Sequence, residues 1–116
     1  MTIFADNKIS TMPSENAFIH HVYFWLKRPD SQEDLASLLE GLRKLSAAKG
    51  IRYCHIGKPA QTNRDVIERG YAVSWLLFFD NAADQDNYQT DPIHLAFVDS
   101  CSHLWEKVIV YDSIAY

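Results

Sequence analysis

The sequence predicts an α+β fold, a ferredoxin-like β-α-β-β-α-β unit whose four strands form one antiparallel sheet. Three observations support this prediction. Four segments carry the alternation or the apolar density of strands, two regions repeat apolar residues at helical spacing, and the two kinds of segment follow one another in the split β-α-β order. With 116 residues, the chain has the length of a single domain.

The first strand is expected at residues 18–26, where both faces are rich in apolar or aromatic groups. One face carries Phe18, His20, Val22, Phe24 and Leu26, and the other carries Ile19, His21, Tyr23 and Trp25. Ser31 can cap the next element, an amphipathic helix that ends near Gly50. Its leucines recur at three and four residues, at positions 35, 38, 39, 42 and 45.

The rest of the chain supplies three strands and the second helical region. The second strand is predicted at residues 51–57, a polar connection at 58–70, and the third and most hydrophobic strand at 71–79. A short helix is expected from Asp80 or Asn81 to Tyr88. Asp91 is an N-cap residue followed by Pro92, so a helix is predicted from Asp91 to residue 105, ahead of a closing strand at 108–112.

A histidine lies in the apolar stripe of this last helix. At helical spacing, His94 shares one face with Phe97, Val98, Cys101, Leu104 and Trp105. An ionisable imidazole in a row that faces the core needs a structural or a chemical reason. Two interpretations stay open: a structural hydrogen bond, for example to Asp112, or acid–base chemistry in a pocket.

Composition and charge exclude several classes of function. The net charge is -4 and no basic cluster is present, which argues against nucleic-acid and anionic-membrane partners. The longest apolar run is too short to span a bilayer, and no secretory signal is visible, so a cytoplasmic protein is expected. Cys54 and Cys101 lack metal or redox spacing and are expected to be reduced core thiols. Residues 1–17 are predicted as an arm, and residues 18–116 as the domain.

The second face of the predicted sheet leads us to expect a homodimer. Two helices cover only one face of a four-stranded sheet, so the other face carries His21, Tyr23 and Trp25, together with Leu76 and Phe78. Such a patch is larger than soluble monomers usually expose. At about 25 cal/mol per Å², burial against an identical sheet is strongly favourable, and the two sheets are expected to close into a barrel.

The order of several short motifs resembles the stress-responsive dimeric α/β barrel (Dabb) family. Residues 20–27 read H-x-V-x-F-x-x-K, Gly70 and Tyr71 lead into the third strand, and the 88–97 segment contains Pro-x-His-x-x-Phe. The resemblance covers residues 18–113 and implies a ferredoxin-like monomer and a barrel dimer. It implies little about chemistry, because most members have no established reaction.

The C-terminal half resembles the olivetolic acid cyclase branch of this family, which closes polyketides. By position, the resemblance implies that Tyr88 and His94 are catalytic, that His20 is a pocket histidine, and that Asp112 orients His94. Val73 stands where the cyclases have another pocket histidine. This departure argues against the cyclases' own substrate and reaction, while a ligand pocket remains expected.

The expected pocket lies between the helices and the sheet, and its ligand-binding residues are His20, Val22, Val73, Phe97 and Trp105, beside the catalytic set. A neutral imidazole can take a proton from carbon next to a carbonyl, and a tyrosine hydroxyl can bind the developing enolate oxygen. An apolar or aromatic ligand suits such a lining. No metal and no cofactor are expected.

Three hypotheses about function follow. The first is a small-molecule binding protein or a cofactor-free, polyketide cyclase-like lyase. The second is a structural or stress-related dimer whose histidines serve packing. The third is a cofactor-free monooxygenase-like enzyme, which the broader fold allows. An open cavity that reaches His94 and Tyr88 favours the first hypothesis over the second.

Overall fold

Four strands and three α-helices follow one another in the computed structural model, which describes residues 15–116. Their order is β1 (Phe18–Leu26), α2 (Gln32–Leu45), β2 (Ile51–Gly57), β3 (Val73–Phe79), α3 (Ala82–Gln89), α4 (Pro92–Cys101), a 3-10 turn η1 (Ser102–Leu104) and β4 (Trp105–Ile114). This order confirms the predicted ferredoxin-like fold. The predicted arm of residues 1–17 lies, up to residue 14, outside the described residues.

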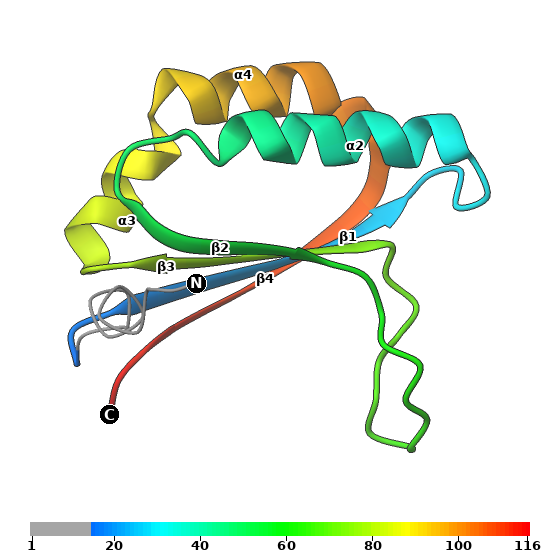
Figure 1. The fold of residues 1–116 in the computed structure, drawn as a ribbon, viewed down its shortest axis with the longest axis horizontal. Coiled ribbons are helices and arrows are strands. Elements are labelled where there is room, and N and C mark those ends of the chain that lie inside the picture. The colour runs from blue at the N-terminus through cyan, green and yellow to red at the C-terminus, as the bar shows by residue number, and fades with distance from the viewer. Residues whose placement is uncertain (1–14) are drawn as a thin grey trace, which may run out of the picture.

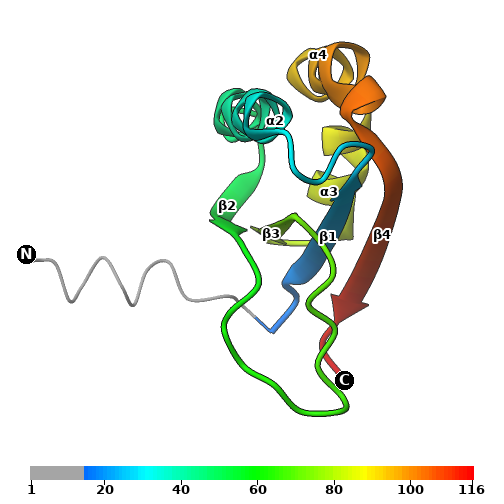
Figure 2. The same ribbon diagram turned by 90° about the vertical axis from the view of Figure 1, so that its right-hand side faces the viewer.

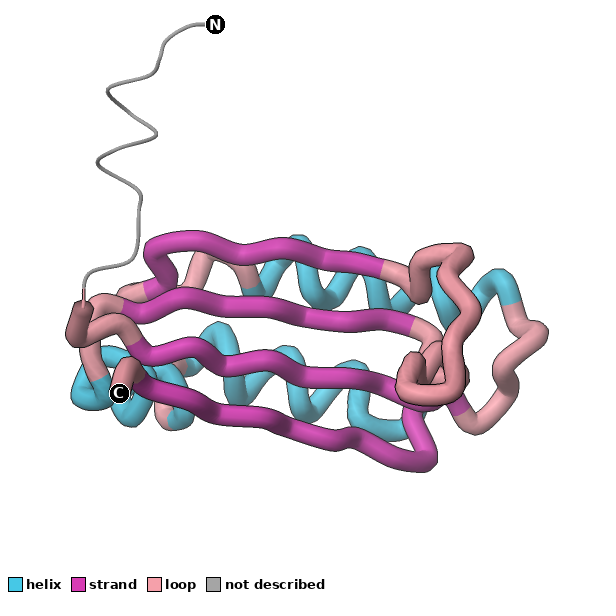
Figure 3. The backbone as a smooth tube through the Cα atoms, turned by 90° about the horizontal axis from the view of Figure 1, so that it is seen from below, coloured by secondary structure: helices cyan, strands magenta, loops and turns pink. Residues whose placement is uncertain are grey.

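The strands form one antiparallel sheet in the order β2-β3-β1-β4. The helices lie on one side of this sheet, with α2 and α4 side by side, and the connection between β2 and β3 hangs on the other side (Figures 1 and 2). Seen from that other side, the strands stand in front of the helices (Figure 3). None of the helices within residues 15–116 has the length and apolar composition needed to cross a membrane.

The hydrophobic core lies between the sheet and the helices, at the positions that the strand and helix periodicities predicted. Every second residue of β1 and β3 faces the helices, and the fully buried side chains of β3 include Val73, Trp75, Leu77 and Phe79. From α2, Leu38, Leu42 and Leu45 complete the layer, each with at most 1% of its surface exposed. Burial of each such leucine stabilises the fold by roughly 1.5–3 kcal/mol. The predicted cap is present too, because Ser31 Oγ accepts the backbone N–H of Asp34 at 3.1 Å.

The last helix is shorter than predicted. It ends at Cys101, and the 3-10 turn then brings the chain to β1, where the backbone N–H of Lys27 donates to the carbonyl of Leu104 at 3.0 Å. Trp105 is therefore the first residue of β4 rather than the end of the helical stripe. The third strand also begins two residues later than predicted, at Val73.

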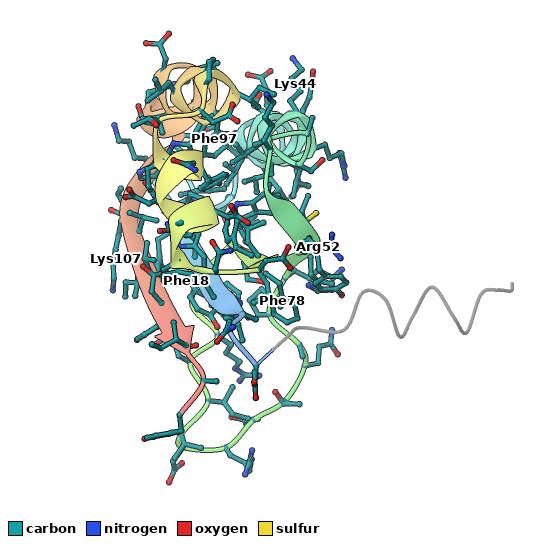
Figure 4. All side chains as sticks on the ribbon, turned by 90° about the vertical axis from the view of Figure 1, so that its left-hand side faces the viewer. Phe18, Lys44, Arg52, Phe78, Phe97 and Lys107 are labelled. Carbon is teal, nitrogen blue, oxygen red and sulfur yellow. The ribbon has the colours of Figure 1, made fainter. Side chains whose placement is uncertain are left out.

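The side of the sheet without helices is apolar and aromatic, and we call it the outer face: Ile19, His21, Tyr23, Trp25, Tyr53, His55, Leu76, Phe78, Lys107, Ile109 and Tyr111. In Figure 4, Phe78 points to this side, and Phe97 lies on the helix side. The ring of Tyr23 lies 4.9 Å from that of Tyr71, and the Lys107 ammonium lies 4.4 Å from the ring centre of Trp25. The predicted second face of the sheet is therefore present as one continuous surface.

Candidate functional site

A small cavity of about 150 Å³ lies between the sheet and helices α3 and α4. Most of its lining is apolar and comes from β1, α4 and β4, and its ionisable groups are His20, Tyr88 and His94. Five of the predicted residues (His20, Val22, Tyr88, His94 and Phe97) line it from the elements that the sequence predicted, and Trp105 lines it from β4.

Two of the predicted residues lie elsewhere. Val73 does not line the cavity: it is packed in the core at the start of β3, paired with Phe24 and four residues along β1 from His20. Asp112 does not line it either, but it contacts a residue that does. The remaining lining residues, which sequence reasoning missed, are Phe24, Leu45, Trp75, Gln89, Val98, Val108 and Val110.

Asp112 contacts His20, whereas His94 bonds to the backbone, so the predicted pairing of Asp112 with His94 is wrong. His20 on β1 and Asp112 on β4 are directly opposite in the strand register, and the distance from His20 Nδ1 to Asp112 Oδ1 is 2.6 Å. A carboxylate only accepts, so Nδ1–H of His20 donates to it. In the neutral ring this contact selects the tautomer with the lone pair on Nε2, as in the oriented imidazole of a catalytic triad.

His94 finds its partner on the backbone. Its Nδ1 lies 3.1 Å from the carbonyl oxygen of Gln89, at the turn between α3 and α4. Because a carbonyl only accepts, Nδ1 carries the proton and Nε2 carries the lone pair. Burial lowers the pKa of His94, the Gln89 carbonyl partly opposes this effect, and the nearby His20 lowers the pKa further. His94 is therefore a neutral imidazole at pH 7.

Tyr88, near the end of α3, is held by Trp75 of β3, which sequence reasoning did not single out. Only 1% of Tyr88 is exposed, and its hydroxyl oxygen accepts the indole N–H of Trp75 at 3.3 Å. Burial raises the pKa of Tyr88 to about 12, although the Trp75 hydrogen bond acts in the opposite direction. The phenol thus keeps its proton, and within residues 15–116 no side chain or carbonyl accepts it.

The two histidines lie beside the ring of Tyr88. The ring of Tyr88 lies 4.6 Å from that of His94 and 5.9 Å, edge on, from that of His20. Two imidazoles and one phenol therefore line the same largely apolar cavity. This set can take a proton from a ligand and donate a hydrogen bond to a ligand oxygen. No group of three His, Cys, Asp or Glu side chains within the described part of the chain lies close enough to hold a metal ion.

A comparison with known protein families identifies the family of this domain. The sequence profile of the Stress responsive A/B Barrel Domain (Dabb) matches residues 18–115. The chain belongs to the Dabb family. The match covers almost the whole predicted domain, and it confirms the resemblance that the sequence motifs indicated. No protein with a curated description matches the chain.

Solved structures share the Dabb fold. A Dabb protein with a ferredoxin-like fold from Mesorhizobium loti is 24% identical, with a TM-score of 0.72 over 86% of this chain and 97% of that chain. The hydroxynitrile lyase from Passiflora edulis is 21% identical, with a TM-score of 0.71 over 89% and 96%. A dimeric ferredoxin-like protein of unknown function from Thermobifida fusca is 14% identical, with a TM-score of 0.68 over 84% and 90%. At these identities the similarity establishes a common fold.

The neutral state of His94 predicts a loss of stability in mild acid. Its pKa in the folded protein is below the ordinary value of 6.5, so below pH 6.5 the unfolded chain binds more protons than the folded one. Stability then rises with pH in this window, and the free energy of unfolding should fall as the pH drops from 7.5 through 6.5. Urea unfolding at pH 7.5 and 5.5 measures the loss.

The matched variants are His94→Gln, which cannot charge, and His103→Gln, which changes an exposed imidazole. We expect the difference in unfolding free energy between the two pH values to shrink in His94→Gln and to stay as in the wild type in His103→Gln. An unchanged difference in His94→Gln would contradict the assignment.

Proposed function

We propose that this Dabb protein binds a small oxygen-bearing ligand in the cavity and transfers protons on it, in aldol-type carbon–carbon bond formation or cleavage. The observation that carries the proposal is the buried hydroxyl of Tyr88, whose proton meets no acceptor among the described residues. A buried donor without a partner costs about 1–3 kcal/mol. A ligand oxygen would satisfy it.

In this proposal His20 is the general base. Asp112 fixes its tautomer at 2.6 Å and stabilises the imidazolium that forms when Nε2 takes a proton. Tyr88 donates to the ligand oxygen on which negative charge develops. His94, which is neutral, offers the second acceptor and bounds the cavity beside the Tyr88 ring. Positioned acid–base groups of this kind accelerate reactions by about 10²–10⁴-fold.

Two reactions fit this set of groups. In ring closure, the base takes a proton from carbon next to a carbonyl, the carbanion attacks a second carbonyl of the same ligand, and the new alkoxide takes the proton back. In hydroxynitrile cleavage, the hydroxyl loses its proton, the bond to the nitrile carbon breaks, and cyanide takes the proton from the imidazolium. Neither sequence needs an oxidant or a cofactor. The similarity to the Passiflora edulis lyase supports the second reaction.

A ligand screen by thermal shift tests the proposal. The probes are benzaldehyde, mandelonitrile and benzoylacetic acid, and release of benzaldehyde from mandelonitrile is followed in parallel. At a hundredfold excess over Kd, a ligand stabilises the folded protein by about 2.7 kcal/mol, which raises Tm by several degrees. We expect a shift in the wild type that Tyr88→Phe and His94→Ala lose and the exposed control His103→Ala retains.

The alternative is a non-catalytic dimer in which these residues only pack, and the edge-on and tilted contacts of the Tyr88 ring favour it. No shift with any probe, together with a marked loss of stability in His94→Ala, would support this alternative and overturn the proposal.

We also infer that the protein is a homodimer whose outer faces meet. The β2–β3 connection covers only one end of this face, where Tyr71 contacts Tyr23 and Trp25, and leaves Tyr53 and Tyr111 exposed. A second copy offers an identical surface, and such self-complementary contacts are typical of twofold dimers. The dimeric state of the Thermobifida fusca protein supports this inference.

A further inference from the structure

We propose that Trp75 is the positioning and size-limiting residue of this cavity, so that its ligands are single-ring or short-chain carbonyl and hydroxyl compounds. The positioning role rests on the proposed function, in which the hydroxyl of Tyr88 donates to a ligand oxygen. The size limit depends on the shape of the cavity alone.

Trp75 lies in the middle of the sheet, at the floor of the cavity. It occupies β3, with Val22 of β1 on one side and Ile56 of β2 on the other, and only 1% of it is exposed. Its indole is among the largest fully buried side chains of the described residues. Strands on both sides fix its backbone, and the indole is packed in the core, so we expect it to keep its place when a ligand binds.

The positioning role follows from the chemistry of the indole. The ring N–H can only donate, and it donates to the hydroxyl oxygen of Tyr88 at 3.3 Å. The phenol oxygen is thus held by a fixed donor, and its own proton must point elsewhere. Trp75 thereby makes Tyr88 a donor to the ligand. The pKa of Tyr88, about 12, agrees with a phenol that donates and does not act as a base.

The size limit follows from the volume. The cavity measures about 150 Å³, whereas sites for drug-sized ligands measure about 300–1,000 Å³. Trp75 fills the side of the cavity toward β3, where a smaller residue would leave space between Val22 and Tyr88. A single aromatic ring with one oxygen substituent fits this volume. A ring with a long alkyl chain exceeds this volume, and we expect the indole to block its extension toward β3.

Two variants separate the two roles. Trp75→Phe keeps a ring but removes the donor, and Trp75→Leu removes both the donor and the bulk. The probes form two series with alkyl groups of one, three and five carbons on the ring: alkylbenzenes, and the matching 4-alkylbenzaldehydes. Binding to the full chain is measured by calorimetry, after circular dichroism has shown that each variant keeps the fold.

For the size limit, we expect the wild type to bind toluene at least tenfold more tightly than pentylbenzene. Trp75→Leu should reverse this order or abolish it. Equal binding of the two hydrocarbons by the wild type, or an unchanged preference in Trp75→Leu, would overturn the size limit. Because hydrocarbons need no hydrogen bond, this result does not depend on the proposed function.

For positioning, Trp75→Phe should bind 4-methylbenzaldehyde about 2- to 12-fold more weakly than the wild type does, the usual range for one hydrogen bond. Its affinity for toluene should change less, which a merely structural role would not produce. Equal losses for both probes would overturn the positioning role. If the wild type shows no preference for the aldehyde over toluene, the proposed function fails, and so does positioning, while the hydrocarbon series still decides the size limit.

Discussion

Wild-type protein is expected to sediment as a dimer, and the Tyr111→Glu variant as a monomer. Tyr111 is 64% exposed on β4, so a glutamate there leaves the core of the subunit intact. The ring of Tyr111 lies 6.1 Å from that of Tyr23, so in a dimer of outer faces a glutamate at this position is buried among aromatic rings. An unpaired charge buried there costs several kcal/mol. At 1.4 kcal/mol per factor of ten, self-association weakens by about a hundredfold or more.

Sedimentation velocity over a wide concentration range measures this effect. Leu95→Glu is the matched control, because Leu95 is 54% exposed on α4, on the helix side of the sheet. The control should remain dimeric. If Leu95→Glu dissociates and Tyr111→Glu does not, the helix layer and not the outer face forms the interface.

The fold was predictable because its two faces are encoded by local periodicity. The alternation of β1 fixes which side chains face the helices, and all of its inward positions from His20 to Leu26 are buried. The leucines of α2 and the caps at Ser31 and Asn81 depend only on residues close in sequence. For this reason the elements were found within a few residues of their ends, except where Trp105 joins β4 through a long-range pairing with β1.

The site was less predictable, because its hydrogen bonds depend on register. Sequence placed Asp112 on the last strand, but which histidine it meets is decided by the pairing of β4 with β1. Val73 and Trp75 share a face of β3, and only the position of α3 decides that Trp75 reaches Tyr88. The close packing of α2 against α4 was also not predictable from the sequence pattern. At Gly41 of α2, a Cβ atom would lie 2.5 Å from Sγ of Cys101 on α4.

The register of β1 and β4 leads to the prediction with the largest expected effect on activity. In Asp112→Asn the neutral amide still fills the position opposite His20, but it no longer stabilises an imidazolium, and it can donate to Nδ1 and move the proton of His20 to Nε2. With a proton on Nε2, His20 could no longer act as the base. If the protein cleaves mandelonitrile as proposed, its turnover should fall by about 10²–10⁴-fold in Asp112→Asn, with little change in ligand affinity.

Steady-state kinetics of Asp112→Asn against Asp86→Asn, which changes an exposed carboxylate on α3, separates this effect from a change in net charge. The control should keep wild-type kcat and KM, and Asp112→Asn should lose kcat at nearly unchanged KM, because Asp112 acts through His20 and does not line the cavity. If Asp112→Asn keeps its turnover while His94→Ala loses it, the base is His94, and the contact of His20 with Asp112 only joins β1 to β4.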